Sequence, residues 1–331
     1  MVLRKKTDPG TTGGRDAILA RVANPVCYNC RDPFENGDNL KPLSRLTCPR
    51  CSTRQVVPAR IDQFVLEREL GKGGMGTTYR AFDTSLHRNV AIKLISDLHA
   101  GHSSIEDIIR EARRAAALSH PIIVPVYSIG SVQGMPFIVM ELLSDQPLSR
   151  QVSKGIPIEE EFALQTGLAI ARALASAAEA GILHLDIKPA NILHDRFGVA
   201  KLIDFGLACH LNENRSDMRG TCLYMAPERL RERTQDFRSD QYSLGLTLWH
   251  ALAGKVPLDA ENLPLLIDRI LTVAPPLLSE VRAGLNRWTV GLVHQMIAHK
   301  PEERYQSYED LIWAFEFVLN DLREAASPHS P

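Results

Sequence analysis

The stretch His184-Leu-Asp-Ile-Lys-Pro-Ala-Asn191, followed by Asp204-Phe-Gly206, decides the fold and the chemistry expected of this chain. It brings two carboxylates, an ammonium group and a carboxamide within about twenty residues of one another. Such a set can hold two Mg²⁺ ions, a nucleoside triphosphate and an acceptor hydroxyl together. Because phosphoryl transfer depends mainly on positioning and on neutralising the charge of the moving group, this oxygen-rich cluster is a sufficient catalyst. The stretch therefore predicts a phosphate-transfer site.

The composition is that of an ordinary globular protein. The chain has 331 residues, of which 44% are hydrophobic and 23% charged, enough for one large domain with or without a small appendage. The net charge of −1 gives no global reason to expect binding to nucleic acid or to a membrane. The charge is uneven, because residues 1–60 carry eleven Lys/Arg against five Asp/Glu, net +6, and residues 61–331 carry 27 against 34, net −7.

The sequence contains no stretch that predicts a membrane span or an export signal. No run of eighteen uninterrupted apolar residues exists, and the basic start is not followed by an apolar core. The most apolar stretch, 162–183, is interrupted by Gln165, Arg172 and Glu179, which indicates a buried amphipathic helix. Four of the six cysteines form CxxC pairs. Without an export signal, these pairs favour metal binding over disulfides and predict a reducing, cytoplasmic compartment.

Strand-like runs occupy the first third of the chain beyond the cysteines, and helical patterns occupy the remainder. Apolar and β-branched runs predict strands at 64–70, 89–95, 122–127 and 136–140, and helical spacing covers 104–118. Further helices are expected near 240–253, 285–299 and 307–323, with loops at 184–198 and 204–228. This order predicts two unequal lobes with a hinge near 141–144.

The segment Gly71-Lys-Gly-Gly-Met-Gly76 is a weak signal by itself, since glycine triplets also serve simple turns. Its context is stronger, because a predicted strand precedes it and Val90-Ala-Ile-Lys93 follows. Glycine lets the backbone lie close over phosphates, where amide N–H groups can point at the oxygens. Lys93 is flanked by apolar residues and would need a carboxylate partner and an anionic ligand to remain charged. The alternative is a strand lysine that reaches solvent, and the glycine segment favours the phosphate interpretation.

Together, these motifs closely resemble the eukaryotic-like protein kinase family, particularly the bacterial serine/threonine kinases. The resemblance runs from about residue 64 to residue 322, with five motifs in family order. It implies an α+β, bilobal fold with a small β-rich N-lobe at 64–140, a hinge at 141–144 and a larger helical C-lobe at 145–322. The remaining segments are expected to be a flexible N-terminus at 1–23, a zinc ribbon at 24–56 and a tail at 323–331.

The resemblance also assigns a role to each motif residue. It implies that Lys93 contacts the α- and β-phosphates and pairs with Glu111, and that Asp186 accepts the proton of the acceptor hydroxyl or orients it. Lys188 would touch the γ-phosphate. Asn191 and Asp204 would hold Mg²⁺, or Mn²⁺, beside ATP. The remaining nucleotide-binding residues would be the glycines Gly71, Gly73, Gly74 and Gly76, the adenine-slot side chains Leu70, Thr78, Ala91, Met140 and Leu193, and the backbone of Glu141 and Leu143.

Later motifs fit the same family. The segment Gly220-Thr-Cys-Leu-Tyr-Met-Ala-Pro-Glu228 resembles the peptide-positioning segment, and Thr221 matches the threonine that meets the catalytic aspartate. Glu228 is expected to form a buried structural ion pair with Arg304, and Asp240 to brace the catalytic loop. The residues Lys188 and Thr221 favour serine/threonine over tyrosine as the phosphorylated hydroxyl on protein substrates.

Two positions depart from the family pattern. Leu185 stands where the family usually has the arginine that neutralises an activation-loop phosphate. Because leucine replaces this arginine, the sequence predicts activity that does not require phosphorylation of the activation loop. Ser216 is the only hydroxyl residue between the Asp204-Phe-Gly206 motif and Gly220, which weakly supports activity without phosphorylation of this loop. Thr78 replaces the usual valine above the adenine and predicts only a modest change in nucleotide affinity.

The cysteines predict a structural zinc site. Two CxxC turns, Cys27-Tyr-Asn-Cys30 and Cys48-Pro-Arg-Cys51, are separated by seventeen residues. Each turn offers two thiolates, and the two turns complete a tetrahedral site for Zn²⁺, with free thiols or disulfides as the alternatives. Metal binding would stabilise a segment too short to fold unaided. The basic residues of the ribbon are Arg31, Lys41, Arg45, Arg50, Arg54 and Arg60.

The ribbon is expected to contact a protein partner or the chain's own kinase lobe. Nucleic-acid binding is disfavoured because few aromatic residues are available for base stacking. Two other functions stay open at this point. One is a pseudokinase scaffold whose output is binding, supported only by Leu185. The other is a zinc-ribbon regulator that binds nucleic acid or protein and carries a kinase domain.

Overall fold

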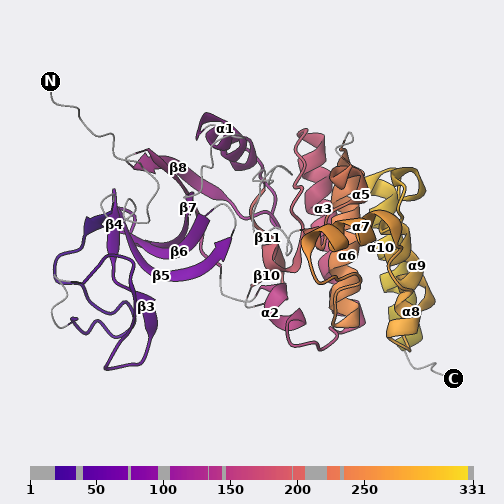
Figure 1. The fold of residues 1–331 in the computed structure, drawn as a ribbon, viewed down its shortest axis with the longest axis horizontal. Helices are drawn as coiled ribbons and strands as arrows, with labels where there is room; N and C mark the ends of the chain where they lie inside the picture. Colours follow the sequence, from indigo (N-terminus) through magenta and orange to yellow (C-terminus); the bar gives the residue numbers. More distant parts are fainter. Residues whose placement is uncertain are drawn as a thin grey trace. The chain divides into compact units, whose positions relative to one another are not determined.

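The computed structural model describes residues 19–34, 40–73, 76–95, 105–132, 134–143, 147–195, 197–205, 222–231 and 235–326, except for the side chains of 105–108 and 111. The chain divides into two compact units (Figure 1). Unit 1 comprises Met1–Leu98 and Val126–Leu142, and unit 2 comprises His99–Pro125 and Leu143–Pro331. Unit 1 is rich in strands and unit 2 in helices, which confirms the predicted α+β class.

Unit 1 is built on a seven-stranded antiparallel sheet of order β1-β4-β5-β6-β7-β9-β8 (Figure 1). The strands of this sheet are β1 (Ala20–Arg21), β4 (Ala59–Ile61), β5 (Phe64–Gly73), β6 (Gly76–Asp83), β7 (Arg88–Ile95), β8 (Val126–Val132) and β9 (Met135–Glu141). The separate pair β2 (Arg45–Thr47) and β3 (Arg54–Val56) forms a two-stranded antiparallel sheet within the cysteine-bearing segment.

The cysteine-bearing segment shares one hydrophobic core with the large sheet. Val56 and Ala59 lie in the same buried cluster as Phe64, Leu66 and the strands that follow. Ala59 of β4 also pairs directly with Leu66 of β5. Because these apolar side chains are removed from water together, the segment before residue 64 is stabilised by its contact with the sheet. Of the two contacts expected for the ribbon, with a protein partner or with its own chain, the structure shows the second within unit 1.

Unit 2 is organised around long buried helices. Its helices are α1 (Ile105–Ala116), α2 (Leu148–Val152), α3 (Glu160–Glu179), α5 (Pro227–Leu230), α6 (Phe237–Ala253), α7 (Leu263–Thr272), α8 (Leu278–Val281), α9 (Arg287–Met296) and α10 (Tyr308–Ala326), with short 3-10 turns η2 (Pro189–Asn191) and η3 (Pro301–Glu303). Two short strands, β10 (Ile192–His194) and β11 (Ala200–Leu202), form an antiparallel pair. The apolar faces of α3, α6 and α10 supply much of one large core. No helix in the part of the chain that the structure describes is long and apolar enough to cross a membrane.

Side-chain caps fix where the helices of unit 2 begin. The Glu159 carboxylate accepts hydrogen bonds from the backbone N–H groups of Glu161 and Phe162 at the start of α3. Asp236 caps α6 by accepting from the N–H of Arg238. These caps satisfy donors that have no partner inside the helix. At the other end of α6, Gly254 adopts a left-handed conformation with φ of 72°, which favours glycine and ends the helix.

The structure corrects two expected elements. The strand expected at 122–127 is wrong, because β8 begins only at Val126 and Ile123 makes a single bridge to Leu202 in unit 2. Pro121 precedes this segment and Pro125 lies within it, and neither has an N–H to donate to a sheet, which explains the break. The strand β6, by contrast, lies where only a glycine-rich turn and its continuation were expected. The loop expected at 184–198 contains η2 and β10.

Candidate active site

The segment 184–191, here named the catalytic loop, is anchored by a fully buried carboxylate. Asp240 lies on the first turns of α6 and is 1% exposed. Its Oδ2 accepts a hydrogen bond of 2.7 Å from the His184 N–H, and its Oδ1 accepts one of 2.7 Å from the Leu185 N–H. Burial raises the pKa of Asp240 above its usual range, and these N–H groups act in the opposite direction. The structure thus brings Asp240 to the loop that it was expected to brace.

His184 fixes the loop from the other side. Its Nε2 lies 2.9 Å from the carbonyl oxygen of Ile203, and its Nδ1 accepts a 3.2 Å hydrogen bond from the Asp186 N–H. These partners assign the ring proton to Nε2, where it can be donated to the carbonyl. The ring also packs edge-on against Phe205, with 4.6 Å between ring centroids. His184 therefore connects Asp186 to the segment that carries Asp204.

Asp186 is surrounded by two of the residues predicted to act with it. The Lys188 Nζ lies 2.9 Å from Asp186 Oδ2. The Asn191 Nδ2 donates to the same Oδ2 at 3.0 Å and to the Asp186 backbone oxygen at 2.8 Å. Asn191 is buried, whereas the side chains of Asp186 and Lys188 are 17% and 22% exposed. The Asp186 carboxylate is thus held in place and remains partly exposed.

The β10–β11 hairpin carries Asp204 to the same end as the catalytic loop. Ile192 pairs with Leu202, and the Ile203 N–H donates a 3.0 Å hydrogen bond to the Asn191 carbonyl. Asp204 follows directly and adopts a left-handed conformation with φ of 65°. A non-glycine residue in this region is uncommon and occurs where the surrounding structure imposes it. The hairpin thus places Asn191 and Asp204, the two predicted Mg²⁺ ligands, on adjoining segments.

Leu185, predicted to depart from the family pattern, is held through its backbone. Its φ of 59° is left-handed. Its carbonyl oxygen accepts a hydrogen bond from the Arg229 guanidinium, while its N–H donates to Asp240. Arg229 is 5% exposed. A cationic group from another segment therefore lies beside this residue, although the leucine side chain carries no charge.

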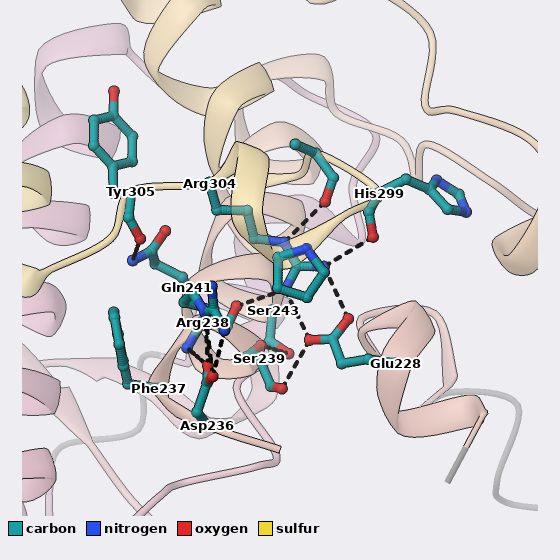
Figure 2. A network of polar contacts seen from close by, with 12 residues as sticks. Glu228, Asp236, Phe237, Arg238, Ser239, Gln241, Ser243, His299, Arg304 and Tyr305 are labelled. Atoms are coloured by element: carbon teal, nitrogen blue, oxygen red, sulfur yellow. Dashed lines mark hydrogen bonds and ion pairs between the residues drawn. The ribbon is translucent and has the colours of Figure 1, made fainter. Parts of the chain in front are cut away.

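The expected pair of Glu228 and Arg304 is present and almost completely buried (Figure 2). The guanidinium binds the carboxylate through two bonds of 2.8 and 2.9 Å, and Ser239 Oγ donates a third bond of 2.8 Å to Glu228. Arg304 also donates to the carbonyl oxygens of Ala298, Arg238 and His299. Burial raises the pKa of Glu228, but the bonds from Arg304 outweigh it and leave that pKa below its usual value. This network connects α5, α6 and η3 within unit 2.

Unit 1 positions the residues predicted to bind the nucleotide. Lys93 lies on β7 between Thr78 of β6 and Ile138 of β9, and it is 8% exposed. Ala91 pairs with Met140 across β7 and β9, and both side chains are buried. Leu70, Gly71 and Gly73 lie on β5, Glu141 ends β9, and Leu143 follows. Leu193 lies on β10 in unit 2.

Among the described glycines of this segment, Gly76 is the one that its surroundings require. A Cβ atom at this position would collide with the carbonyl group of Leu94 on the neighbouring strand β7. Gly71 and Gly73 have open space at the same place, so packing does not require glycine at either position. Gly74, Thr221, Ser216 and the side chain of Glu111 lie outside the described residues.

The four cysteines of the ribbon form one compact cluster. Their Sγ atoms all lie within 4.8 Å of one another, with 3.6 Å between Cys27 and Cys51 and 3.7 Å between Cys30 and Cys48. Zn–S bonds of about 2.3 Å in a tetrahedron place sulfur atoms about 3.8 Å apart, whereas a disulfide requires about 2.05 Å. The cluster therefore fits a tetrahedral metal ion, and none of these cysteines forms a disulfide.

The two CxxC turns, here named the knuckles, have the same backbone design. In the first, the Cys27 carbonyl accepts from the Arg31 N–H, and the Cys27 N–H donates to Asp32. In the second, the Cys48 carbonyl accepts from the Ser52 N–H, and the Cys48 N–H donates to Thr53. Arg31 and Ser52 are both left-handed, with φ of 62° and 56°. These bonds turn each backbone so that two thiols point to one side.

Sequence reasoning missed three contributors to the site. His184, Arg229 and the Asp236–Arg238 ion pair beside Arg304 were given no role. His184 begins the catalytic loop and Arg229 directly follows Glu228. Their position next to predicted site residues could have indicated that both contribute to the site. Nothing in the sequence indicated their partners, because those lie up to 44 residues away.

Comparison with known proteins gives a consistent set of relatives. A family model described as "Protein kinase domain" matches residues 64–313. Serine/threonine-protein kinase PknH of Mycobacterium bovis is 34% identical over 261 residues, covering 77% of this chain and 44% of PknH. Serine/threonine-protein kinase PrkC of Bacillus subtilis is 32% identical over 254 residues, covering 75% of this chain and 39% of PrkC.

A third relative extends the match slightly. Serine/threonine-protein kinase PknB of Mycolicibacterium smegmatis is 33% identical over 281 residues, covering 82% of this chain and 44% of PknB. The chain therefore spans about two fifths of the length of the curated relatives it matches.

Proposed function

The chain belongs to the protein kinase family, and from this premise we propose that it transfers the γ-phosphoryl group of ATP to serine or threonine hydroxyls of protein substrates. The observation that carries the proposal is the catalytic loop, in which Lys188 and Asn191 both contact the Asp186 carboxylate. The relatives named above as serine/threonine-protein kinases support the choice of hydroxyl. We also propose that the protein acts in the cytoplasm.

The proposed roles follow the chemistry of each side chain. Asp186 orients the acceptor hydroxyl and takes its proton as the new O–P bond forms and the bond to the ADP oxygen breaks. Lys188 stabilises the charge that develops on the transferred group. Asn191 and Asp204 hold Mg²⁺ or Mn²⁺, which neutralises charge on the phosphates when it is bound.

The nucleotide is proposed to bind through residues of unit 1 together with Glu111, Leu143 and Leu193. Lys93 pairs with the α- and β-phosphates and with Glu111, as it does by resemblance in the family. The segment Gly71–Gly76 covers the phosphates, where backbone N–H groups can approach closely. Leu70, Thr78, Ala91, Met140 and Leu193 line the adenine slot, and the backbone of Glu141 and Leu143 bonds the base edge. By resemblance to the family, Thr221 is proposed to meet Asp186.

We further propose that activity does not require phosphorylation of the activation loop. Leu185 cannot pair with a phosphate, and its backbone is already held by Asp240 and Arg229. Because these contacts order the catalytic loop from within, a phosphate on Ser216 would add little. The four-cysteine cluster is proposed to bind structural Zn²⁺, for which its sulfur spacing is suited.

Turnover of ATP on a generic protein substrate tests the proposed reaction. Asp186→Asn should lower the rate by about 10²–10⁴-fold, because a positioned base is lost. Asp268→Asn, an exposed carboxylate on α7, is the matched control and should retain the wild-type rate. Equal rates for Asp186→Asn and wild type would contradict catalysis and favour a binding scaffold. Ser216→Ala and phosphatase-treated wild type should both keep full activity, and a large loss in either would refute phosphorylation-independent activity.

A further inference from the structure

The ribbon, residues 24–56, contacts both strands that flank the glycine segment. We name β5 and β6 the glycine hairpin, since they pair with each other up to Gly73 and Gly76. The position of these two strands decides where the glycine backbone lies over a bound phosphate. Any group that restrains both strands at once therefore restrains the nucleotide-binding segment.

The first contact is a forked ion pair to β5. Arg45 of β2 directs its Nη2 to both oxygens of Glu69, at 2.9 and 3.0 Å, and its Nε to Oε2 at 3.3 Å. Glu69 lies two residues before Gly71. A guanidinium that binds both oxygens of a carboxylate fixes the direction of the pair as well as its distance. Arg45 thus holds β5 close to the start of the glycine segment.

The second contact is to β6. The Arg80 guanidinium lies 4.7 Å from the ring centroid of Tyr28, which belongs to the first knuckle. The same guanidinium lies 3.7 Å from Glu67 Oε2 on β5 and donates a 2.9 Å hydrogen bond to Asn89 on β7. Arg80 is therefore held between an aromatic ring of the ribbon and the carboxylate of a neighbouring strand. Arg80 lies four residues after Gly76.

Apolar packing makes these contacts one rigid unit. Val56, at the end of the ribbon, is 1% exposed and belongs to the same core as Leu66 of β5 and Ala81 of β6. Ala59 and Ile61 of β4 then pair with Leu66 and Phe64 of β5. Both polar contacts therefore arise from a segment that is itself packed on the glycine hairpin.

We propose that the ribbon is a positioning element for the nucleotide, in which Arg45 acts through Glu69 and Tyr28 acts through Arg80. The inference rests on the proposed kinase function, because it needs Mg·ATP to bind under the glycine segment. A hairpin restrained on both strands loses less conformational freedom when the ligand binds, so affinity rises without any new contact to the ligand. The metal-bound state of the ribbon thereby sets the affinity for Mg·ATP.

Calorimetric titration of the full chain with Mg·ATP provides the direct test. Arg45→Met and Tyr28→Leu should each weaken binding by about three- to fivefold, the scale of a partly exposed ion pair or a cation–π contact. Arg50→Met is the matched control. Its pair with Asp32 is a single bond of 2.8 Å with side chains 68% and 29% exposed, so it matches the Arg45 pair in exposure but lies wholly within the ribbon. The control should bind Mg·ATP as wild type does.

Steady-state kinetics distinguish positioning from simple destabilisation. The Arg45→Met and Tyr28→Leu variants should raise the KM for ATP and leave kcat and the KM for the protein substrate unchanged. A variant that only lowers the folded fraction would reduce the rate at all ATP concentrations and leave the KM for ATP unchanged. The exchange Arg45→Glu with Glu69→Arg should recover most of the affinity, because it restores the ion pair in reverse.

Removal of the metal from the full chain provides the third test of the proposal. Chelation should weaken Mg·ATP binding more than either substitution and should speed amide hydrogen exchange on β5 and β6. Unchanged affinity in the Arg45→Met, Tyr28→Leu and metal-free proteins would overturn the inference and leave the proposed kinase function standing. A wild-type protein that binds no Mg·ATP would overturn both.

Discussion

Both the ribbon and the helical unit contain short loops held by polar contacts. These contacts are buried in the helical unit and exposed to solvent in the ribbon. In unit 2, Arg304 has no exposed side-chain surface and Asp240 is 1% exposed, and their partners Glu228 and His184 are buried with them. In the ribbon, the side chains of Arg45 and Arg50 are 78% and 68% exposed in their ion pairs. Exposed pairs contribute little to stability, whereas breaking a buried pair is costly. The helical unit is therefore stabilised by burial, and the ribbon depends on its cysteine cluster and its shared core.

Removing the metal should expose this difference most strongly. Structural zinc contributes on the order of 10–16 kcal/mol to the folding of small domains. Chelation should therefore release amide protection on β2 and β3 of the ribbon and, through the shared core, along β4, β5 and β6. The helices α3 and α6 should keep theirs. Hydrogen exchange measured by mass spectrometry checks the result, and protection lost equally in both units would contradict the comparison.

Two single cysteine variants provide the control for that experiment. Cys48→Ser should abolish stoichiometric zinc in the purified protein. Cys222→Ser changes a buried cysteine outside the cluster and should retain one zinc ion per chain. Wild-type protein that is purified without zinc would contradict the proposed zinc site in the ribbon.

Breaking the buried ion pair should have the next largest effect. Arg304→Met leaves Glu228 charged and unpaired in the interior, and we expect a loss of about 3–5 kcal/mol in the free energy of unfolding. Arg323→Met, which removes an exposed pair with Glu161, should cost at most about 1 kcal/mol. Urea unfolding gives both values. The double change Glu228→Leu with Arg304→Met should recover most of the loss, and equal costs for the two single variants would contradict the role of burial.

Acid should produce the smallest of the three effects. The pKa of Glu228 is lowered in the folded protein, although burial opposes this, because Arg304 binds the carboxylate. Its contribution to stability is thus fully present above the ordinary pKa of 4.5 and is lost as the pH falls through the lowered value. Wild type should therefore lose stability more steeply than the Glu228→Leu, Arg304→Met double variant below that pH. Parallel pH profiles of unfolding would show that the pair is not the titrating element.

Local patterns predicted the parts of the molecule whose chemistry is contained in nearby residues. The cysteine spacing indicated a four-sulfur cluster, and the helical spacing of apolar residues indicated the long helices of unit 2. The pair of Glu228 and Arg304 was expected from family resemblance alone, since 76 residues separate the two partners.

Other features depend on distant contacts and had no local signal. β6 begins with glycine and two threonines and becomes a strand because β5 and β7 supply partners on both sides. The left-handed backbone of Leu185 is imposed by Asp240 and Arg229, and a leucine has no intrinsic preference for it. The contact of Arg45 with Glu69 joins two segments that the sequence divides into separate domains.

The matched knuckles also suggest an order of assembly for the ribbon. Each turn closes hydrogen bonds over only four or five residues, and such short closures form within about a microsecond. Each half can therefore present two sulfur atoms before the other half arrives. The slow step is then the association of the two preformed knuckles around one metal ion. The length of the seventeen-residue segment between them therefore governs how fast the ribbon folds.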